Sequence, residues 1–233
     1  TKQQWHAIKS IRASQDKFIC FLLQGVTGSG KTQVFSELIQ SSIEAKKQVL
    51  LLVPEIGLTK QMETRILNQL KGTLAISHSG LAEGARASAF VAASSGQAQV
   101  LIGTRSSLFT PMPKLGLILV DEEHDAAYKS QEGMRYSARD LAVIRAQQLS
   151  IPIVLSSATP SMESWTAAKN GKYQKLKLTD RPEQRKLPKL VLIDSRLDKP
   201  ENGLTGKARA AIDRAISMGE QALLFLNRRG YSP

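Results

Sequence analysis

Short runs of apolar residues alternate with longer segments of mixed polarity along most of the chain. The apolar runs have the length and the β-branched content of strands that are buried on both faces. In the segment 32–47, Val34, Leu38 and Ile39 fall on one helical face. Strands alternating with helices form a mainly parallel sheet that helices cover on both faces, so we predict an α/β fold. The predicted strands are residues 17–24, 48–53, 74–77, 99–103, 115–121 and 151–157.

This alternation breaks off near residue 178, and we predict that residues 1–178 form one domain. Residues 179–189 are polar and charged and contain two prolines, which is typical of a linker. Residues 190–233 contain a further strand–helix–strand pattern, at 190–194, 205–217 and 221–226. A lone βαβ unit buries too little surface to stand as a domain, so we interpret it as the beginning of a second, truncated α/β lobe.

The charge of the chain is strongly positive. Lys and Arg number 32 against 20 Asp and Glu, which leaves a formal charge of +12. This excess favours a polyanionic partner, nucleic acid ahead of a membrane surface, although simple solubility is an alternative. Cys20 is the only cysteine, which excludes a disulfide within the chain and a four-cysteine zinc site. The start of the chain lacks a signal-peptide pattern and no apolar run is long enough for a membrane helix, so we expect a soluble, cytoplasmic protein.

Residues 25–32, "GVTGSGKT", match the phosphate-loop pattern G-x-x-x-x-G-K-[ST] between a predicted strand and a predicted helix. The glycines let backbone N–H groups approach phosphate oxygens, and the helix adds its positive end. We expect Lys31 to contact the β- and γ-phosphates of ATP or ADP and Thr32 to ligate Mg²⁺. A glycine-rich turn that binds nothing is the alternative. The candidate nucleotide-binding residues are Gly25, Val26, Thr27, Gly28, Ser29, Gly30, Lys31 and Thr32.

Acidic residues follow the strand predicted at 115–121, at the edge of a parallel sheet where ligands bind. We predict that Asp121 holds Mg²⁺, through water, and that Glu122 orients and deprotonates the attacking water. Consecutive acids that merely end a strand in solvent are the alternative. His124 could couple these acids to residues 156–160, because a neutral imidazole can donate and accept at once. We therefore take Lys31, Asp121, Glu122 and His124 as the candidate catalytic residues.

The letters "DEEH" at 121–124 resemble the DExH signature of superfamily 2 helicases. Other blocks follow in the order of that superfamily. "VPEIGLT" (53–59) and "GTRSSLF" (103–109) resemble blocks that contact the nucleic-acid backbone. "SSATP" (156–160) resembles the block that links hydrolysis to movement between lobes. Each block alone is a weak signal, but together with the phosphate loop, in order and at strand ends, they are a strong one.

The similarity extends to one family within that superfamily, the primosomal replication-restart DNA helicases. It is carried by the blocks above together with "HSGL", "YKSQEGMRYSARDLAV", "SATPSMES" and "LFLNRRGYSP". The resemblance implies a RecA-like phosphate-loop lobe followed by part of a second one. It also implies an ATP-driven 3′–5′ helicase that acts on forked DNA at stalled replication forks. Restart and primosome proteins would be its partners, and it would work in the bacterial cytoplasm at the nucleoid.

Further site residues follow from this resemblance. Gln4 matches the glutamine that contacts adenine in the family, with Gln3 as the second choice of position and an exposed helix-start glutamine as the alternative. Arg105 in "GTRSSLF" is the candidate for a DNA phosphate contact, and a salt bridge within the lobe is its alternative.

The segment 125–140 interleaves aromatic residues with cations, a combination suited to single strands, because rings stack on bases while cations meet phosphates. The resemblance implies an aromatic-rich loop here that senses DNA and triggers hydrolysis. Met134 stands where the family pattern has tryptophan. A surface loop whose tyrosines pack on the core is the alternative. The candidate DNA-binding residues of this segment are Tyr128, Lys129, Arg135 and Tyr136.

The same resemblance places the transition-state arginines and the zinc-binding cysteines of the family beyond residue 233, so zinc is expected only there. By the same resemblance, we expect that the chain does not include the amino-terminal DNA-binding portion of the family. We therefore expect the chain by itself to bind nucleotide but to hydrolyse it slowly. Two further hypotheses stay open: a nucleotide-gated DNA-binding module that does not translocate, and another superfamily 2 motor, such as one directed to RNA.

Overall fold

The computed structural model describes residues 1–26, 28–54, 72–131, 133–179 and 189–225. The chain divides into two compact units, Thr1–Gln184 and Arg185–Pro233. Each unit is described by itself below. No helix in these described ranges is long and apolar enough to cross a membrane.

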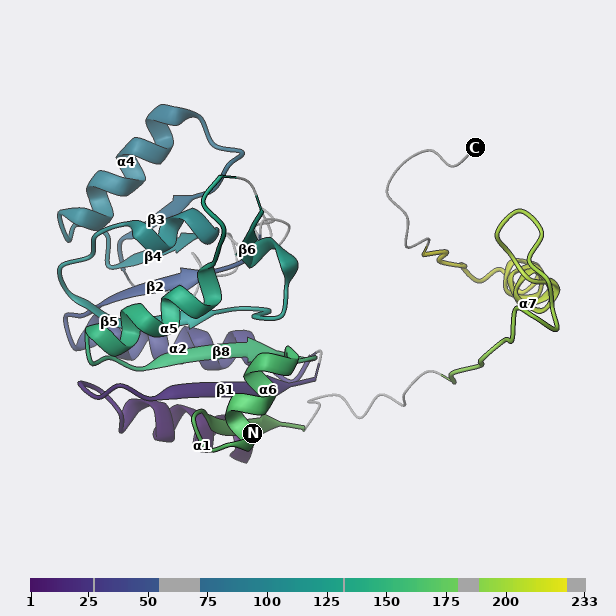
Figure 1. Ribbon diagram of the computed structural model, residues 1–233, viewed down its shortest axis with the longest axis horizontal. Coiled ribbons are helices and arrows are strands. Elements are labelled where there is room, and N and C mark those ends of the chain that lie inside the picture. The colour runs from purple at the N-terminus through teal and green to yellow at the C-terminus, as the bar shows by residue number, and fades with distance from the viewer. Residues whose placement is uncertain (27, 55–71, 132, 180–188, 226–233) are drawn as a thin grey trace. The chain divides into compact units, whose positions relative to one another are not determined.

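The first unit is built on a seven-stranded sheet in the order β3-β4-β2-β5-β8-β1-β9, and each neighbouring pair is parallel (Figure 1). The predicted α/β fold with a parallel sheet is confirmed. The strands are β1 (Cys20–Gly25), β2 (Gln48–Leu52), β3 (Leu74–Ser77), β4 (Val100–Gly103), β5 (Leu115–Val120), β8 (Ile153–Ser157) and β9 (Gln174–Leu178).

Strand β9 was not predicted from the sequence. Its residues, "QKLKL", alternate polar and apolar side chains, and it lies at the edge of the sheet beside β1. Only Leu176 and Leu178 of this strand are fully buried. A run of five residues, two of them charged, does not by itself indicate a strand, and it becomes one because the neighbouring strand β1 supplies hydrogen-bond partners.

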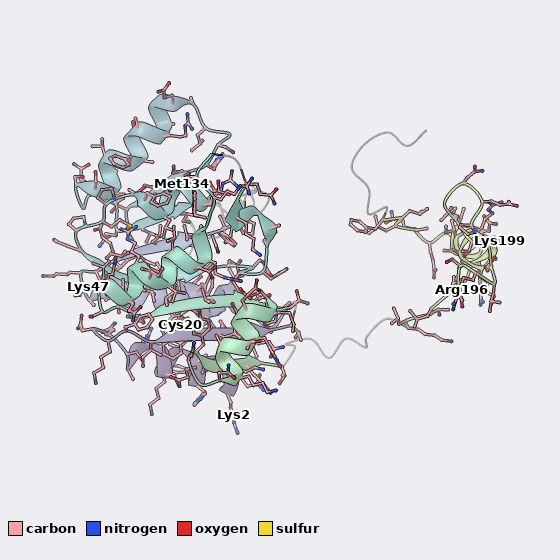
Figure 2. The ribbon with its side chains drawn as sticks, viewed as in Figure 1. Lys2, Cys20, Lys47, Met134, Arg196 and Lys199 are labelled. Carbon is pink, nitrogen blue, oxygen red and sulfur yellow. The ribbon has the colours of Figure 1, made fainter. Side chains whose placement is uncertain are left out.

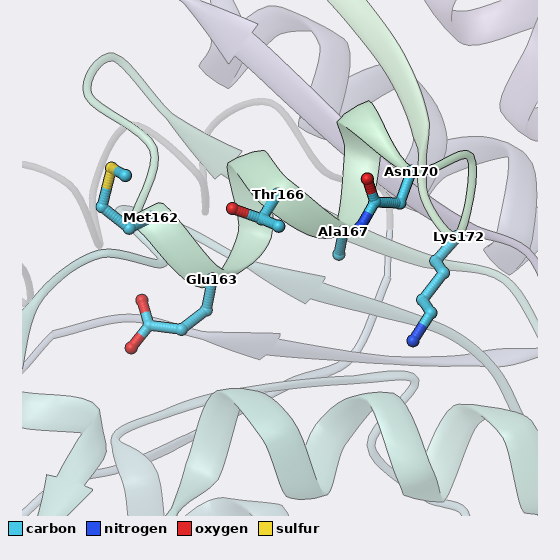
Figure 3. Close-up of a pocket in the computed structure, with 6 residues that line it drawn as sticks. All are labelled: Met162, Glu163, Thr166, Ala167, Asn170 and Lys172. Carbon is cyan, nitrogen blue, oxygen red and sulfur yellow. The ribbon is translucent and has the colours of Figure 1, made fainter.

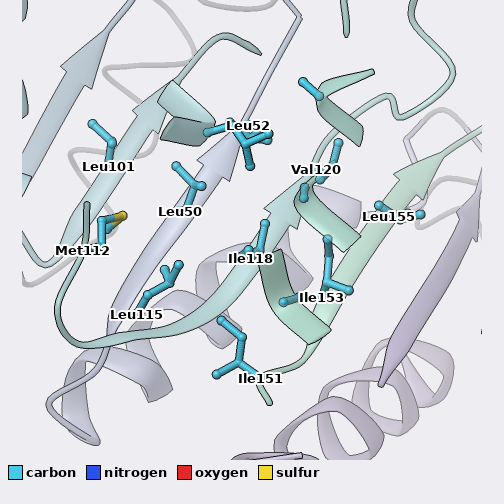
Figure 4. Close-up of a cluster of buried hydrophobic side chains, with 14 of the residues drawn as sticks. Leu50, Leu52, Leu101, Met112, Leu115, Ile118, Val120, Ile151, Ile153 and Leu155 are labelled. Carbon is cyan, nitrogen blue, oxygen red and sulfur yellow. The ribbon is translucent and has the colours of Figure 1, made fainter. Parts of the chain in front are cut away.

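The two faces of the sheet bury separate hydrophobic clusters, because successive strand residues point to opposite sides. Leu51 and Leu119 belong to the cluster that α1 and α2 cover. Leu50 and Ile118 belong to the cluster that α4 and α5 cover (Figure 4). The helices are α1 (Lys2–Arg12), α2 (Lys31–Glu44), α4 (Glu83–Ser94), α5 (Ala138–Gln148) and α6 (Met162–Lys169).

A small antiparallel hairpin interrupts the strand–helix alternation. Its strands are β6 (Lys129–Ser130) and β7 (Tyr136–Ser137), and we call residues 129–137 the basic hairpin. The short 3-10 helix η3 (Ala126–Tyr128) precedes it, and α5 follows directly, with the side chain of Ser137 accepting a hydrogen bond from the backbone N–H of Asp140. The 3-10 helix η2 (Arg105–Phe109) follows β4.

The second unit contains helix α7 (Gly206–Ser217), which confirms the helix predicted at 205–217. The strands predicted at 190–194 and 221–226 were wrong for the residues described there, which are neither strand nor helix. Leu192 and Leu223 are 87% and 97% exposed. An apolar run becomes a strand only when another strand accepts its hydrogen bonds, and the described residues of this unit offer none beyond the single bridge Glu201–Leu204.

Candidate nucleotide-binding and hydrolytic site

Three loops meet at one edge of the sheet because the strands before them are parallel and neighbouring. They follow β1, β5 and β8, which lie in the order β5-β8-β1. The phosphate loop is residues 25–32, the acidic box is residues 121–124, and residues 156–160 form the "SSATP" block. Segments far apart in the sequence are thereby placed within contact distance.

The phosphate loop has the backbone that its glycines were predicted to supply. Strand β1 ends at Gly25 and helix α2 begins at Lys31. Gly28 and Gly30 have φ angles of +78° and +83°, in the region that favours glycine. The Lys31 Nζ donates to the carbonyl oxygen of Gly25 at 2.9 Å. Thr27 lies outside the described residues.

Lys31 also faces the acidic box. Its Nζ lies 3.5 Å from Oε1 of Glu122, so the loop after β1 and the loop after β5 are in contact. Glu122 has a φ angle of +43°, which turns the chain sharply at the end of β5. Asp121, beside it, accepts hydrogen bonds from the backbone N–H of Glu122 at 3.1 Å and from Oγ of Ser156 at 3.2 Å. The structure therefore brings together the three candidate residues Lys31, Asp121 and Glu122.

The electrostatics at Asp121 are unfavourable for a carboxylate. Burial, and next the negative charge of Glu122, raise its pKa above the ordinary value, against the smaller opposing effects of its hydrogen bonds and of Lys31. A cation at this carboxylate would relieve that penalty. Asp121 is therefore suited to metal binding by its environment as well as by its oxygen ligands.

His124 connects the acidic box to the "SSATP" block, as the sequence predicted. Its Nδ1 lies 2.8 Å from Oγ of Ser157 and 3.5 Å from Oε2 of Glu122, and its Nε2 lies 3.5 Å from Oγ1 of Thr159. The contact is present, and the catalytic part of His124 stays a prediction.

Gln4 reaches the phosphate loop from the first turn of α1. Its Nε2 donates to the carbonyl oxygen of Ser29 at 3.0 Å. A Cβ added at Gly30 would lie 2.1 Å from the same Nε2, so the close approach of Gln4 depends on glycine at that position. The adenine contact expected of Gln4 stays a prediction.

The residues of this edge fit a nucleotide phosphate with Mg²⁺. The hydroxyl of Ser29 is buried and has no hydrogen-bond partner among the described residues, which is costly unless a ligand supplies one. Thr32 stands in the first turn of α2, where a hydroxyl next to Lys31 can join Asp121 as an oxygen ligand. The loop, the hydroxyls and the carboxylates thus match the chemistry of the ligand.

The basic hairpin forms a second candidate site. Lys129, Arg135 and Tyr136 line a pocket of about 450 Å³. The ring of Tyr136 meets that of Phe109 edge to face, with the centroids 5.2 Å apart. Arg105 Nη1 donates to the carbonyl oxygen of Lys129 at 3.3 Å, so the "GTRSSLF" block contacts the hairpin.

Tyr128 corrects one sequence prediction. Its side chain is only 2% exposed, and its hydroxyl donates to the backbone carbonyl of Asp121 at 2.6 Å. A base cannot stack on a ring that solvent does not reach, so in this structure Tyr128 packs on the core, as the alternative for this segment had it. Met134 is the opposite case: it is 70% exposed at the turn of the basic hairpin (Figure 2).

Two other motif blocks lie partly outside the described residues. These are residues 55–59 of "VPEIGLT" and residues 226–233 of "LFLNRRGYSP".

Two features of the described residues were not indicated by any sequence motif. A pocket of about 410 Å³ runs along α6 (Figure 3). The buried ion pair between Glu123 and Arg139 was not predicted from the sequence. Its only signal was the extra acid in "DEEH", which cannot be interpreted without a partner.

The comparisons with known proteins agree with this geometry. A family model described as DEAD/DEAH box helicase matches residues 1–167. The chain belongs to the DEAD/DEAH box helicase family. It is 44% identical, over 93% of its length, to the replication restart protein PriA of Haemophilus influenzae, and 39% identical, over its whole length, to PriA of Bacillus subtilis.

This helicase chain spans only about 30% of the length of those curated relatives. Among solved structures, a RecG bound to a three-way DNA junction resembles it with a TM-score of 0.55 and 23% identity, covering 80% of this chain and 24% of the other. That likeness supports the fold, a RecA-like helicase lobe.

Proposed function

We propose that this chain is the nucleotide-binding lobe of an ATP-dependent DNA helicase that acts on forked DNA during replication restart. The contact of Lys31 with Glu122 carries the proposal, because it joins a phosphate loop to an acidic box at the ligand-binding edge of the sheet. The similarity to two replication restart proteins named PriA supports the choice of process. ATP or ADP with Mg²⁺ would be the cofactor.

The nucleotide would bind along the phosphate loop. The backbone N–H groups around Gly28 and Gly30 and the hydroxyl of Ser29 would donate to phosphate oxygens. Lys31 would exchange its bond to the Gly25 carbonyl for the β- and γ-phosphates. Thr32 and Asp121 would hold Mg²⁺, which supplies charge neutralisation at the phosphates when bound.

Glu122 is the candidate general base. Its side chain is 37% exposed, so water can reach it, and its two oxygens are contacted by Lys31 and by His124, each at 3.5 Å. His124 contacts both Glu122 and Ser157, so a change at the Glu122 carboxylate during hydrolysis would alter the contact of His124 with Ser157 in the "SSATP" block. The "SSATP" block would in turn link this change to movement of a second lobe.

DNA would lie over η2 and the basic hairpin. Lys129, Arg135 and Arg105 would meet phosphates, while Tyr136 and Phe109 offer ring surface to bases. The 3′–5′ direction, the restart and primosome partner proteins, and work in the bacterial cytoplasm at the nucleoid follow from the family resemblance and belong to this proposal.

The test is steady-state phosphate release by a polypeptide of the relatives' full length that carries this sequence, with Lys31→Ala as control. Rates are compared without nucleic acid and with linear duplex DNA, forked DNA and structured RNA, at one salt concentration because phosphate contacts are salt-dependent. Strong stimulation by forked DNA, absent in Lys31→Ala, is expected. Equal rates in all conditions would overturn the DNA-driven motor, and stimulation by RNA alone would favour an RNA-directed one.

The chain by itself is proposed to bind nucleotide and to hydrolyse it slowly. It spans about 30% of the curated relatives, and an arginine from a second lobe stabilises the transition state in motors of this kind. The measurement is nucleotide affinity together with turnover for the 233-residue chain. Full turnover that Lys31→Ala abolishes would contradict this part of the proposal, as would a lack of nucleotide binding.

A further inference from the structure

Glu123 and Arg139 form a buried ion pair that the nucleotide site does not use. The side chain of Glu123 is 0% exposed and that of Arg139 is 6% exposed, and Arg139 Nη1 lies 3.2 Å from Oε2 of Glu123. Burial works against the charge of Arg139, but the carboxylates of Asp140 and Glu123 outweigh it and keep its pKa above the ordinary value. Arg139 is therefore charged inside the lobe.

Residues of a third segment form further hydrogen bonds with both members of this pair. Glu123 accepts from the backbone N–H of Ser161 at 2.7 Å, from Oγ of Ser161 at 2.9 Å and from Oγ of Ser164 at 2.8 Å. Arg139 donates from Nη1 to Oγ of Ser161 at 2.7 Å as well. Ser161 is also the residue that caps the start of α6, so the pair is attached to that helix.

The three segments that meet here are those that the proposed function must coordinate. Glu123 follows Asp121 and Glu122 in the acidic box. Arg139 stands two residues after β7 of the basic hairpin, in the first turn of α5. Ser161 follows the "SSATP" block directly. If DNA displaced the hairpin, the movement would therefore be transmitted to Arg139, which stands two residues after β7 and donates hydrogen bonds to Glu123 and Ser161.

Buried ion pairs are poor stabilisers compared with apolar residues of similar volume, so stability alone does not explain this one. Their best-attested use is to hold one arrangement of the parts that they join. At the hairpin, Lys129 pairs with Glu163 of α6 at 3.7 Å, and both side chains are more than half exposed. A DNA phosphate could displace Glu163 from Lys129 at little cost.

We propose that the Glu123–Arg139 pair is the positioning link through which DNA at the basic hairpin controls the hydrolytic site. The inference rests on the proposed function. Glu123 and Arg139 are positioning residues: they touch neither nucleotide nor DNA, and they act by placing Asp121 and Glu122 on one side and Ser161 with α6 on the other.

The experiment uses the full-length polypeptide described above, with the variants Glu123→Gln and Arg139→Lys. Four quantities are measured: the melting temperature, the Kd of a fluorescent ADP analogue, the Kd of forked DNA, and the phosphate-release rate with and without saturating forked DNA. The expected result is a DNA stimulation that falls by about 3–30-fold, the range for single changes in a coupling network. The unstimulated rate and both Kd values should stay within about twofold of the unsubstituted protein.

Two further variants separate positioning from mere structure. Asp140→Asn removes the charge of one exposed partner of Arg139 and leaves the bond to Glu123, so it should keep the stimulation. The double variant Glu123→Gln/Arg139→Gln leaves no buried charge unpaired, so its melting temperature should recover relative to the single variants while its stimulation stays low. Where a single variant fails to fold, Ser164→Ala removes one bond to Glu123 and should give a smaller loss of the same kind.

Three outcomes would overturn the inference. They are a stimulation that persists in Glu123→Gln and Arg139→Lys, an equal proportional fall of the stimulated and unstimulated rates, and a loss of stimulation that follows the Kd of DNA. These results would leave the proposed function standing. An unsubstituted protein that DNA does not stimulate would overturn both proposals, and the two failures are therefore distinguishable.

Discussion

Glu122 and Glu123 are adjacent in the acidic box, yet the fold gives them opposite surroundings. Glu122 is 37% exposed at the ligand-binding edge, where Lys31 and His124 each lie 3.5 Å from one of its oxygens. Glu123 is fully enclosed and accepts hydrogen bonds from Arg139, Ser161 and Ser164. The two carboxylates are therefore suited to different roles. Glu122, which is loosely held, can exchange protons, whereas Glu123, whose oxygens are all hydrogen-bonded, can only hold segments together.

The backbone explains why the two side chains diverge. Glu122 occupies the left-handed region at the end of β5, so the chain turns there. The N–H of Glu123 then donates to the carbonyl of Ser156 at 2.9 Å, which extends the pairing with β8 and directs Glu123 inward. The predictions below test this division between a chemical and a structural side of the acidic box.

The largest expected effect is on turnover at the chemical side. Glu122→Gln should lower phosphate release by about 10²–10⁴-fold, the usual contribution of a general base, with little change in nucleotide affinity. Phosphate release by the full-length polypeptide and titration with a fluorescent ADP analogue measure the two quantities. Glu83→Gln, on the exposed start of α4, is the matched control. Full turnover in Glu122→Gln would remove Glu122 from the mechanism.

The next effect is on stability at the structural side. Glu123→Ala removes the buried partner of Arg139 and leaves that charge with the exposed carboxylates of Asp140 and Glu163, so the free energy of unfolding should fall by about 3–5 kcal/mol. Glu122→Ala breaks the partly exposed contacts with Lys31 and His124 and should cost about 0–1 kcal/mol. Urea denaturation of the chain measures both. Equal losses in the two variants would show that the division is wrong.

The basic hairpin repeats the contrast with a pair of tyrosines. Tyr136 lines the pocket, so Tyr136→Ala should weaken single-stranded DNA binding by about 1–3 kcal/mol if one base stacks there. Tyr128 is buried, so Tyr128→Phe should leave DNA binding unchanged and cost roughly 1 kcal/mol of stability for the lost bond to the Asp121 carbonyl. Fluorescence anisotropy with a labelled strand and urea denaturation distinguish the two. Because phenylalanine keeps the ring, Tyr128→Phe tests only the hydroxyl, and an unchanged free energy of unfolding would show that the bond to the Asp121 carbonyl contributes nothing to stability.

The smallest effect concerns pH and Asp121. Its pKa is raised above the ordinary 3.8 in the folded, nucleotide-free protein, so the folded state holds the proton more tightly than the unfolded state does. The contribution of Asp121 to stability should therefore fall as pH rises from 3.8 through the raised pKa. Asp121→Asn should remove this part of the pH dependence and raise the melting temperature at neutral pH. Superimposable melting-temperature profiles for the two proteins between about pH 4 and 7 would contradict the prediction.

Strands that are buried on both faces could be predicted from the sequence more reliably than strands at the edge of the sheet. The strands of the sheet that are continuous apolar runs were predicted within a few residues, since such runs are typical of strands covered on both faces. Strand β9 was missed because two of its five residues are lysines and it lies at the sheet edge. The apolar runs at 190–194 and 221–226 predict strands equally well, but their described residues are neither strand nor helix and are mostly exposed.

The candidate site followed the same rule. The phosphate loop could be predicted because a local turn creates it, and its glycines and Lys31 need no distant partner to be recognised. The sequence could not predict the opposite surroundings of two pairs of residues, Glu122 with Glu123 and Tyr128 with Tyr136. The surroundings of each residue depend on segments that are far away in the sequence.

The sequence by itself determined the parallel α/β sheet, the loop that can cradle a phosphate, and the acids at the end of β5. These features arise from local periodicity and from motifs a few residues long. Only the tertiary structure decided which acid is free to react, which tyrosine reaches solvent, and that Arg139 meets Glu123. The physical reason is that the charge state and accessibility of a side chain depend on partners that the strand order β5-β8-β1 and the packing of α5 and α6 bring within a few ångströms.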